Sequence, residues 1–161
     1  MAVDYFLKID GIPGESQDDK HSNEIDVESW NWGQVNTGSH AGGGAGGGAG
    51  KVTVHDFNFT MRVSKASPKL FLACATGQHV KEATLVCRKA GKDPQEYLKI
   101  KFSDLLISNY QTGGSTGDVV PVDQVAFNFS KMEISYAPQK SDGSLDSPVV
   151  HNFDVQKNKG G

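Results

Sequence analysis

Two segments with regularly spaced apolar residues flank a run of glycines in the first third of the chain. Each changes the parity of its apolar positions once: Ile25 and Val27 give way to Trp30 and Trp32, and Val52 and Val54 give way to Phe57 and Phe59. Since successive side chains of a strand point to opposite faces, each change predicts a bulge or a switch of buried face. One antiparallel register satisfies all four pairs, opposing Trp32 to Val52, Trp30 to Val54, Val27 to Phe57 and Ile25 to Phe59. We therefore predict a long bent hairpin over residues 25–59, with the glycine run at its tip.

The same alternation predicts further strands along the chain. They cover residues 3–9, 83–88, 98–110, 125–136 and 149–155, and the strand over 125–136 again changes parity. About seven strands at this spacing fit a sandwich or a closed barrel. The repeated parity changes favour the barrel, because bulges turn its corners. The predicted fold class is mainly β, a bulged antiparallel β-barrel with a long glycine-rich hairpin loop, and residues 157–161 are expected to fray.

One short helix is predicted beside the barrel, at about residues 68–76. Ser67 is a good N-cap residue, Pro68 suits the first helical position, and Gly77 suits the C-terminal cap. Leu70, Ala73 and Cys74 fall on one face of this segment, with Phe71 and Ala75 beside it. A helix of roughly two to three turns is too short to be stable alone, so we expect it to pack against the sheet.

The composition is that of one soluble globular domain spanning residues 1–161. The chain has 161 residues, of which 37% are hydrophobic and 22% charged, and this length buries a core without disulfides or metals. The net charge is −3 and no basic cluster exceeds Arg88–Lys89, so we expect no nucleic-acid partner. Two cysteines, Cys74 and Cys87, do not make a disulfide framework and are expected to be reduced.

The first ten residues do not read as a cleaved leader. Asp4, Lys8 and Asp10 interrupt any apolar run there, which excludes a general secretory signal peptide. No apolar stretch approaches the ~20 residues that span a bilayer, so no membrane insertion is expected. We expect assembly in the cytoplasm and, if the protein leaves the cell, a route that needs no cleaved signal.

The glycine run invites comparison with a phosphate-binding loop, but the context is wrong. Ala45 stands where the Walker pattern has glycine, and Val52 follows Lys51 where the pattern has Ser or Thr. The segment after the run is a predicted strand, so no helix N-terminus is available to hold a phosphate. We therefore expect no nucleotide cofactor.

No other group of residues predicts catalysis or metal binding. Among the histidines, only His21 clusters with acidic residues (Asp18, Asp19 and Glu24), and this cluster reads as a solvated turn. The segment from Asp142 to Asp146 lacks the later Glu of a calcium loop and is better read as a turn. We expect no metal, no cofactor and no enzymatic activity.

Pattern alone leaves the role of the glycine-rich tip open. Glycine allows close backbone approach but costs entropy to order, so the tip is either disordered or an arm that orders against a neighbour. Two non-enzymatic classes remain: a structural subunit, or a monomeric β-sandwich that binds carbohydrate or another ligand. The second would present exposed Trp30 or Trp32 as stacking platforms.

Several stretches together form a specific signature. Its most specific parts are Phe6–Ile9 and the segment Ile25–Val27 with Trp30, Trp32 and Gly33, and the Ser-Pro helix, LVCRKAGK and PQKSDGS follow in order. In this combination the chain resembles the haemolysin-coregulated protein (Hcp) family over essentially its whole length.

The resemblance implies a fold, a function and partners. Members of that family form the inner tube of the bacterial type VI secretion system, as hexameric rings of β-barrels with a flanking helix. The rings stack into a tube, similar to phage tail tubes, that a sheath drives out of the cell and whose lumen carries or protects small effector proteins. Implied partners are further copies of the chain, the sheath and spike proteins, and effectors.

The resemblance also assigns residues to these roles. It implies that Asn31, between the predicted core anchors Trp30 and Trp32, lines the ring channel and contacts cargo. The extended loop, about residues 38–51, is expected to reach neighbouring subunits through Gly38, His40, Gly44, Gly48 and Lys51. Ring stacking is expected to use Ala90, Gly91, Lys92 and Asp93 on one face, and Gln156 and Lys157 on the other.

Overall fold

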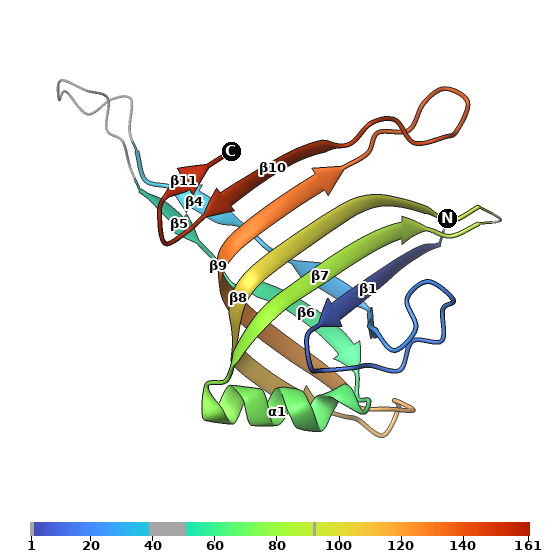
Figure 1. Ribbon diagram of the computed structural model, residues 1–161. Helices are drawn as coiled ribbons and strands as arrows, with labels where there is room; N and C mark the ends of the chain where they lie inside the picture. The colour runs from blue at the N-terminus through green and yellow to red at the C-terminus, as the bar shows by residue number, and fades with distance from the viewer. Residues whose placement is uncertain (1, 39–50, 92) are drawn as a thin grey trace.

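In the computed structural model, described for residues 2–38, 51–91 and 93–161, antiparallel strands surround a core and one helix crosses the lower end (Figure 1). The helix is α1 (Ala66–Thr76), between β6 and β7. The strands are β1 (Val3–Ile9), β2 (Ile25–Val27), β3 (Ser29–Asn31), β4 (Gln34–Asn36), β5 (Val52–Val54), β6 (Phe57–Arg62), β7 (His79–Lys89), β8 (Gln95–Gly113), β9 (Val122–Tyr136), β10 (Val149–Asp154) and β11 (Lys159–Gly160). The mainly-β fold with one short helix is as the sequence predicts.

The strand pairings run in a circuit. β1 pairs with β7, β7 with β8, β8 with β9, β9 with β6, and β6 with β3. Only Glu28 separates β3 from β2, which pairs back to β1, so one short segment changes partner and joins the two ends. The backbone N–H of Glu28 already donates to the carbonyl of Thr60 at 2.9 Å. The parity change between Val27 and Trp30 is therefore this change of partner.

The glycine-flanking segments do pair, but in a different register from the predicted one. Trp30 lies opposite Phe59 rather than Val54, and Gln34 takes the place opposite Val54. The irregularity lies around Gly33, whose carbonyl accepts from the His55 N–H at 3.1 Å. Ile25 and Val27 face β1 instead of Phe57 and Phe59, because the chain has changed partner before it reaches the hairpin.

The helix begins earlier than the sequence predicts. It starts at Ala66 with Lys65 before it, and Gly77 ends it in the left-handed conformation at φ 64°. Ser67 is not the N-cap: it lies inside the helix, and its hydroxyl donates at 2.6 Å to the fully buried carboxylate of Asp123. Ser67 therefore resembles an N-cap residue in the sequence, but in the structure its hydroxyl joins the helix to Asp123 in the barrel wall.

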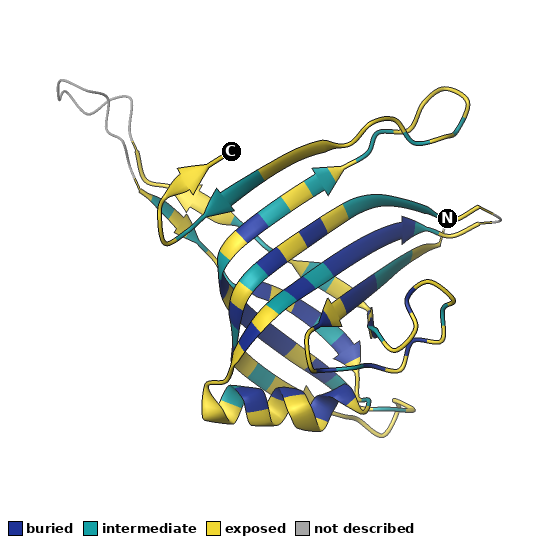
Figure 2. Cartoon of the chain, in the orientation of Figure 1, coloured by how far each residue is buried: buried dark blue, intermediate teal, exposed yellow. Residues whose placement is uncertain are grey.

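Aromatic side chains fill the barrel. Phe57, Phe102 and Phe127 are fully buried, with ring centroids 4.8 to 5.1 Å apart. Phe59 and Phe129 extend the same cluster. Buried and exposed positions alternate along the strands in Figure 2, which is the pattern expected of a barrel wall with one apolar face.

A second buried layer lies outside the barrel, where residues 11–24 cover β1 and β7. Phe6 points outward from β1 and stacks on His21 at 4.4 Å between ring centroids, and the Arg88 guanidinium carbon lies over the Phe6 ring, 4.8 Å from its centroid. Arg88 donates to Asp18 at 2.7 and 2.9 Å and to Asp4 at 3.1 Å. The prediction of a solvated turn at 18–24 is wrong, since His21 is only 6% exposed.

We call this layer the outer clasp: Asp4, Phe6, Asp18, His21, Glu24, Arg88 and Glu96. Its histidine bridges two carboxylates, because Nδ1 of His21 lies 3.0 Å from Glu24 Oε1 and Nε2 lies 2.5 Å from Glu96 Oε1. The clasp therefore fastens the 11–24 segment to both β1 and the start of β8.

Two carboxyl groups of the clasp have lowered pKa values. The hydrogen bonds from Arg88 hold the pKa of Asp18 at about 2, against an ordinary 3.8. Burial alone would raise the pKa of Glu96, but the hydrogen bond with His21 and the charge of Lys99 lower it. Both shifts show that the clasp favours the ionised carboxylates.

The C-terminal residues are ordered rather than frayed. β11 pairs with the end of β10, and Asn152 and Gly161 exchange two backbone hydrogen bonds of 2.9 Å. Within the described ranges, no helix has the length and apolar character needed to cross a membrane.

Candidate interaction surfaces

Part of the outward face of four neighbouring strands carries mainly uncharged polar side chains, although Arg62 lies on the same face of β6 and Ala126 is buried. Two rows cross β3, β6, β9 and β8 at directly opposed positions. One row is Asn31, Asn58, Ala126 and Asn109, and the other is Ser29, Thr60, Gln124 and Gln111. We call these eight residues the amide face; it contains no Asp, Glu, Lys or Arg.

Asn31 lies at one edge of the amide face. It is exposed, and its cross-strand neighbour Asn58 is exposed as well. The side chain before it, Trp30, points the other way, toward the core. Asn31 is thus placed on the outside of the barrel wall, where another molecule can reach it.

The two tryptophans are half-buried and pack on aromatic core residues. Trp30 stacks on Phe57 at 6.0 Å and meets Tyr5 edge-on at 6.2 Å between ring centroids. Trp32 packs on Phe129, and its indole N–H donates at 2.8 Å to the carbonyl of His55. A sugar-stacking platform needs an open ring face, and these contacts occupy one face of Trp30.

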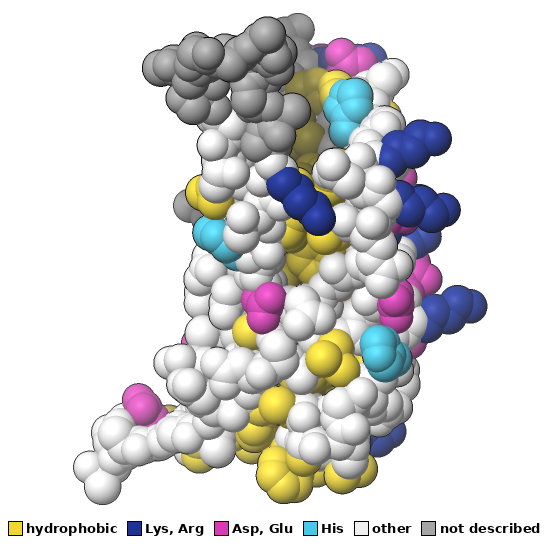
Figure 3. Space-filling view, turned by 90° about the vertical axis from the view of Figure 1, so that its left-hand side faces the viewer, with side chains coloured by type: hydrophobic (Ala, Val, Ile, Leu, Met, Phe, Trp, Pro, Cys, Tyr) yellow, Lys and Arg dark blue, Asp and Glu magenta, His cyan; other side chains and the backbone are white. Residues whose placement is uncertain are grey.

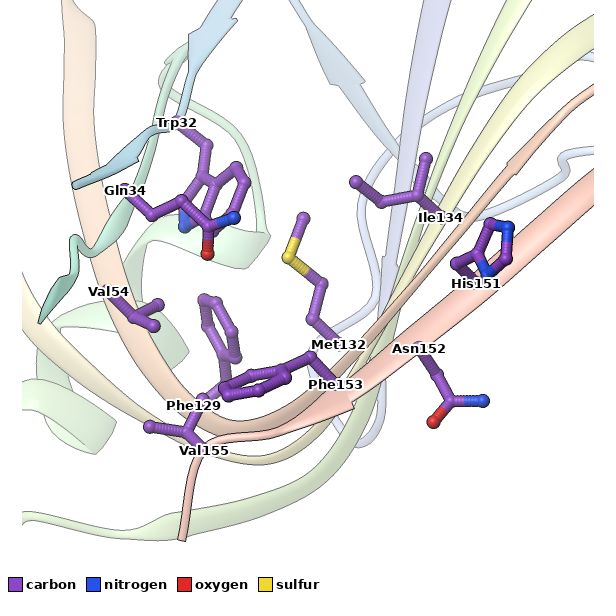
Figure 4. A pocket seen from close by; sticks show the side chains of 10 residues that line it. All are labelled: Trp32, Gln34, Val54, Phe129, Met132, Ile134, His151, Asn152, Phe153 and Val155. Carbon is purple, nitrogen blue, oxygen red and sulfur yellow. The ribbon is translucent and has the colours of Figure 1, made fainter. Parts of the chain in front are cut away.

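Beside Trp32 the wall opens into an apolar hollow of about 190 Å³ (Figures 3 and 4). Trp32 and Val54 come from the base of the hairpin arm, and Met132 and Ile134 come from β9 on the opposite side (Figure 4). The full lining is Trp32, Gln34, Val54, Phe129, Met132, Ile134, His151, Asn152, Phe153 and Val155, which we call the hollow. It includes no Asp, Glu, Lys or Arg.

The hollow is a continuation of the barrel core. Ile134 lies between the buried Ile100 on β8 and His151 on β10, on the same face of the sheet. β8, β9 and β10 lie side by side (Figure 1), and Met132, Ile134 and Phe153 of this sheet line the hollow. Ile134 is consequently left partly exposed there.

The arm that carries the glycine-rich tip forms its own small sheet. β4 and β5 pair only with each other, and Val35 is half exposed. Gly38 and Lys51 are exposed at the end of the described part of this arm. The expected loop residues His40, Gly44 and Gly48 lie outside the described residues.

The two turns assigned to ring stacking lie on opposite sides of the molecule, the β7–β8 turn at the right of Figure 1 and the turn after β10 at the left. Ala90, Gly91 and Asp93 are exposed between β7 and β8, and Lys92 lies outside the described residues. Gln156 and Lys157 are exposed in the turn after β10, where the Lys157 N–H donates to Asp154 at 2.9 Å. The structure thus separates the two groups and brings neither to the hollow.

Sequence reasoning missed the outward face of α1. Phe71 and Leu72 are 59% and 55% exposed, although the pattern placed Phe71 beside the buried face. Pro68 and Ala75 are exposed on the same side. These four residues, which we call the helix stripe, recur at spacings of three and four, and that spacing is the signal that could have identified a second apolar face.

The described residues hold no group of three or more His, Cys, Asp or Glu side chains placed to bind a metal ion. The thiol of Cys87 is buried in the core, and burial raises its pKa to about 11. A thiol with a raised pKa is a poor nucleophile at neutral pH.

Comparisons with known proteins agree over the whole chain. Residues 6–136 match the family described as "Type VI secretion system effector, Hcp". The chain is 45% identical over 160 residues to the protein hcp1 of Pseudomonas aeruginosa, covering 98% of each.

Solved structures give the same result. The structure is similar to that of Hcp1 from Salmonella typhimurium, with 41% identity, 99% of each chain covered and a TM-score of 0.82. It is also similar to a structure described as a type six secretion system protein, with 28% identity, 99% of this chain and 100% of that chain covered, and a TM-score of 0.93.

Proposed function

We propose, from the premise that this chain belongs to the Hcp family of type VI secretion proteins, that six copies close into a ring whose channel is lined by the amide face. As a family member the chain is a subunit of the secretion tube and a carrier of effectors, and it is not an enzyme. The family is secreted through the type VI system. The number of copies, the channel surface and the stacking contacts are our proposals.

The amide face is the observation that carries this proposal. A channel that carries different proteins needs a hydrated surface that does not bind proteins of one charge strongly. The exposed amide groups of Asn31, Asn58 and Gln124 can donate and accept hydrogen bonds, both with water and with a passing protein. The same four strands carry apolar residues on their other side, so the wall is built to face water on this side only.

The hairpin arm supports contact between copies. An isolated two-stranded hairpin is marginally stable in water. β4 and β5 make no ladder with the main sheet, so a neighbouring copy is the natural source of further contacts.

Native mass spectrometry, with negative-stain images, tests the ring. We expect a species of six times the 17.3 kDa chain mass, with a central hole. A chain that stays monomeric at all concentrations would contradict the ring and return the ligand-binding β-sandwich to consideration, with a glycan screen as its test.

Asn31 is proposed to contact cargo inside the channel. Asn31→Trp should leave six copies in the ring and reduce the amount of effector that co-purifies with it. The matched control is Gln17→Trp, since Gln17 is an exposed amide residue of the 11–24 segment, outside the amide face and the arm. Equal retention in both variants would remove Asn31 from the cargo surface.

Stacking is proposed to join the turn of Ala90, Gly91, Lys92 and Asp93 in one ring to Gln156 and Lys157, with the extended loop, in the next. Lys157→Glu should shorten tubes and leave single rings intact, as measured by electron microscopy and native mass. Loss of rings and tubes in equal measure would contradict this division. Sheath and spike proteins are the further partners that we propose for the assembled tube.

A further inference from the structure

The helix stripe is an apolar surface that the described chain leaves uncovered. Pro68, Phe71, Leu72 and Ala75 occupy one side of α1, while Leu70 and Ala73 on the other side are buried against the barrel. A helix that is apolar on both sides normally has both sides buried. Phe71 is 59% exposed and meets the Tyr110 ring edge-on, at 6.4 Å between ring centroids.

No charge protects the stripe. Lys69 is the one charged side chain within α1, and its ammonium group lies 3.4 Å from the Gly11 carbonyl, over the 11–24 segment. The last two turns of the helix, after Lys69, carry none. Such a surface matches one that is also uncharged, because a charged partner would lose its hydration without compensation.

The hollow has the complementary character. It is concave and apolar, it contains no Asp, Glu, Lys or Arg, and no described side chain fills it. It lies at the upper end of the molecule beside β4, β5 and β10, while α1 crosses the lower end (Figures 1 and 3). One copy therefore cannot bring its own stripe to its own hollow.

In a ring of identical copies, the helix stripe of one copy can meet the hollow of its neighbour. Closure by rotation makes every contact heterologous, so each copy must present two different surfaces that fit one another. We infer that the helix stripe of one copy seats in the hollow of the next copy around the ring, with Phe71 and Leu72 as the inserted side chains. This inference rests on the proposed ring and specifies which surfaces build it.

Two variants test the inference by complementation. Leu72→Glu damages the stripe and keeps the hollow, while Ile134→Glu damages the hollow and keeps the stripe. Each alone should be monomeric by native mass spectrometry. An equimolar mixture should give a one-to-one dimer and nothing larger, because only one of the two possible contacts is intact.

Matched controls place the same charge on nearby exposed positions. Val150→Glu lies on the opposite face of the sheet from Ile134, and Gln78→Glu follows the helix outside the stripe. Both should form rings like the unchanged chain. Circular dichroism and thermal melts of all four variants separate a lost contact from a lost fold.

Cysteine cross-linking detects the same contact even if the mixed dimer is too weak to be seen by native mass spectrometry. In a Cys74→Ser background, Leu72→Cys and Ile134→Cys together should give a cross-linked ladder ending at six with a short bismaleimide, and neither cysteine alone should do so. Cys87 is buried and does not compete.

The outcomes separate the two levels of the proposal. If the unchanged chain is monomeric, the proposed ring fails. If it is hexameric and Leu72→Glu or Ile134→Glu still forms rings, only this inference fails. Monomeric variants that neither form a mixed dimer nor give the ladder would show that the two surfaces do not meet.

Discussion

The inner and outer faces of β1 and β7 are both buried, but by opposite means. Inside, Leu7 and Leu85 are fully buried in the same hydrophobic core as the aromatic cluster. Outside, Phe6 and Arg88 belong to the outer clasp, which is held by directed hydrogen bonds between charged groups. The difference predicts that the inner layer sets the stability of the barrel, while the outer layer fixes one segment and depends on pH.

The largest effect is expected inside. Phe127→Ala should reduce the free energy of unfolding by about 4 kcal/mol, because it empties the centre of a fully buried aromatic cluster. Urea unfolding at fixed chain concentration measures this, and Phe127→Leu, which leaves a smaller cavity, should lose less. A loss from Phe127→Ala no greater than that from Arg88→Met would break the comparison.

The next effect is expected in the clasp. Arg88→Met should cost about 3 kcal/mol, since Asp4 and Asp18 lose their charged hydrogen-bond donor. Hydrogen exchange should rise in residues 11–24 and stay low in β6 and β9. The control is Arg62→Met, because Arg62 is exposed and its nearest carboxylate oxygen is 3.8 Å away. Exchange that rises equally throughout the barrel would show that the clasp is not a separate layer.

A smaller effect tests how closely the outer segment is packed. A Cβ added at Gly14 would come within 2.5 Å of the Glu24 carbonyl oxygen. Gly14→Ala should therefore cost about 2 kcal/mol, because backbone must move to admit the methyl group. Gly113→Ala, where nothing lies within 4 Å, is the control and should change unfolding little. Equal behaviour of the two variants would mean that the segment adapts freely.

The smallest effect is the pH dependence of the clasp. A carboxylate whose pKa is lower in the folded chain stabilises the fold above its ordinary pKa, and this contribution is lost as pH falls through the folded value. For Asp18 the loss falls between about pH 3.8 and about pH 2, and the lowered pKa of Glu96 acts in the same direction. Stability should fall with acid more steeply in the unchanged chain than in Arg88→Met. Parallel acid curves would contradict this role of Arg88.

The sequence predicts correctly which residues of a single strand face the core. The alternation of Leu7 and Ile9, and of Leu85 and Cys87, identifies inner-face positions because side-chain direction repeats every two residues. The same alternation predicted that the side chains of Asn31 and Trp30 point to opposite faces of the strand. The register of the hairpin could not be obtained this way, because an alternation that repeats every two residues fits several registers. The predicted pairs are wrong on both sides of Gly33, where Trp30 lies opposite Phe59 and Gln34 lies opposite Val54.

The clasp and the helix stripe were beyond the same reasoning for different reasons. His21 meets Glu96, and Arg88 meets Asp4, across long stretches of chain, so no local pattern marks them. The 18–24 segment looked solvated because its polar residues find partners only after folding. The spacing of Pro68, Phe71, Leu72 and Ala75 does indicate an apolar outward side of α1. A helix that flanks a barrel is expected to bury only one face, so this spacing did not predict a second apolar surface.

The change of partner at Glu28 bears on the order in which the protein acquires its structure during synthesis. β1 can pair with β2 early, since Leu7 and Ile25 are close in sequence. The other edge of β1 can pair only once β7 has been synthesised, because Val3 lies opposite Lys89. In the same way, β6 can pair with β9 only once Phe127, which lies opposite Phe57, has been synthesised. Contacts between such distant residues form slowly. The wall therefore stays open until the first half of β9 has left the ribosome, and assembly with other copies must follow that moment.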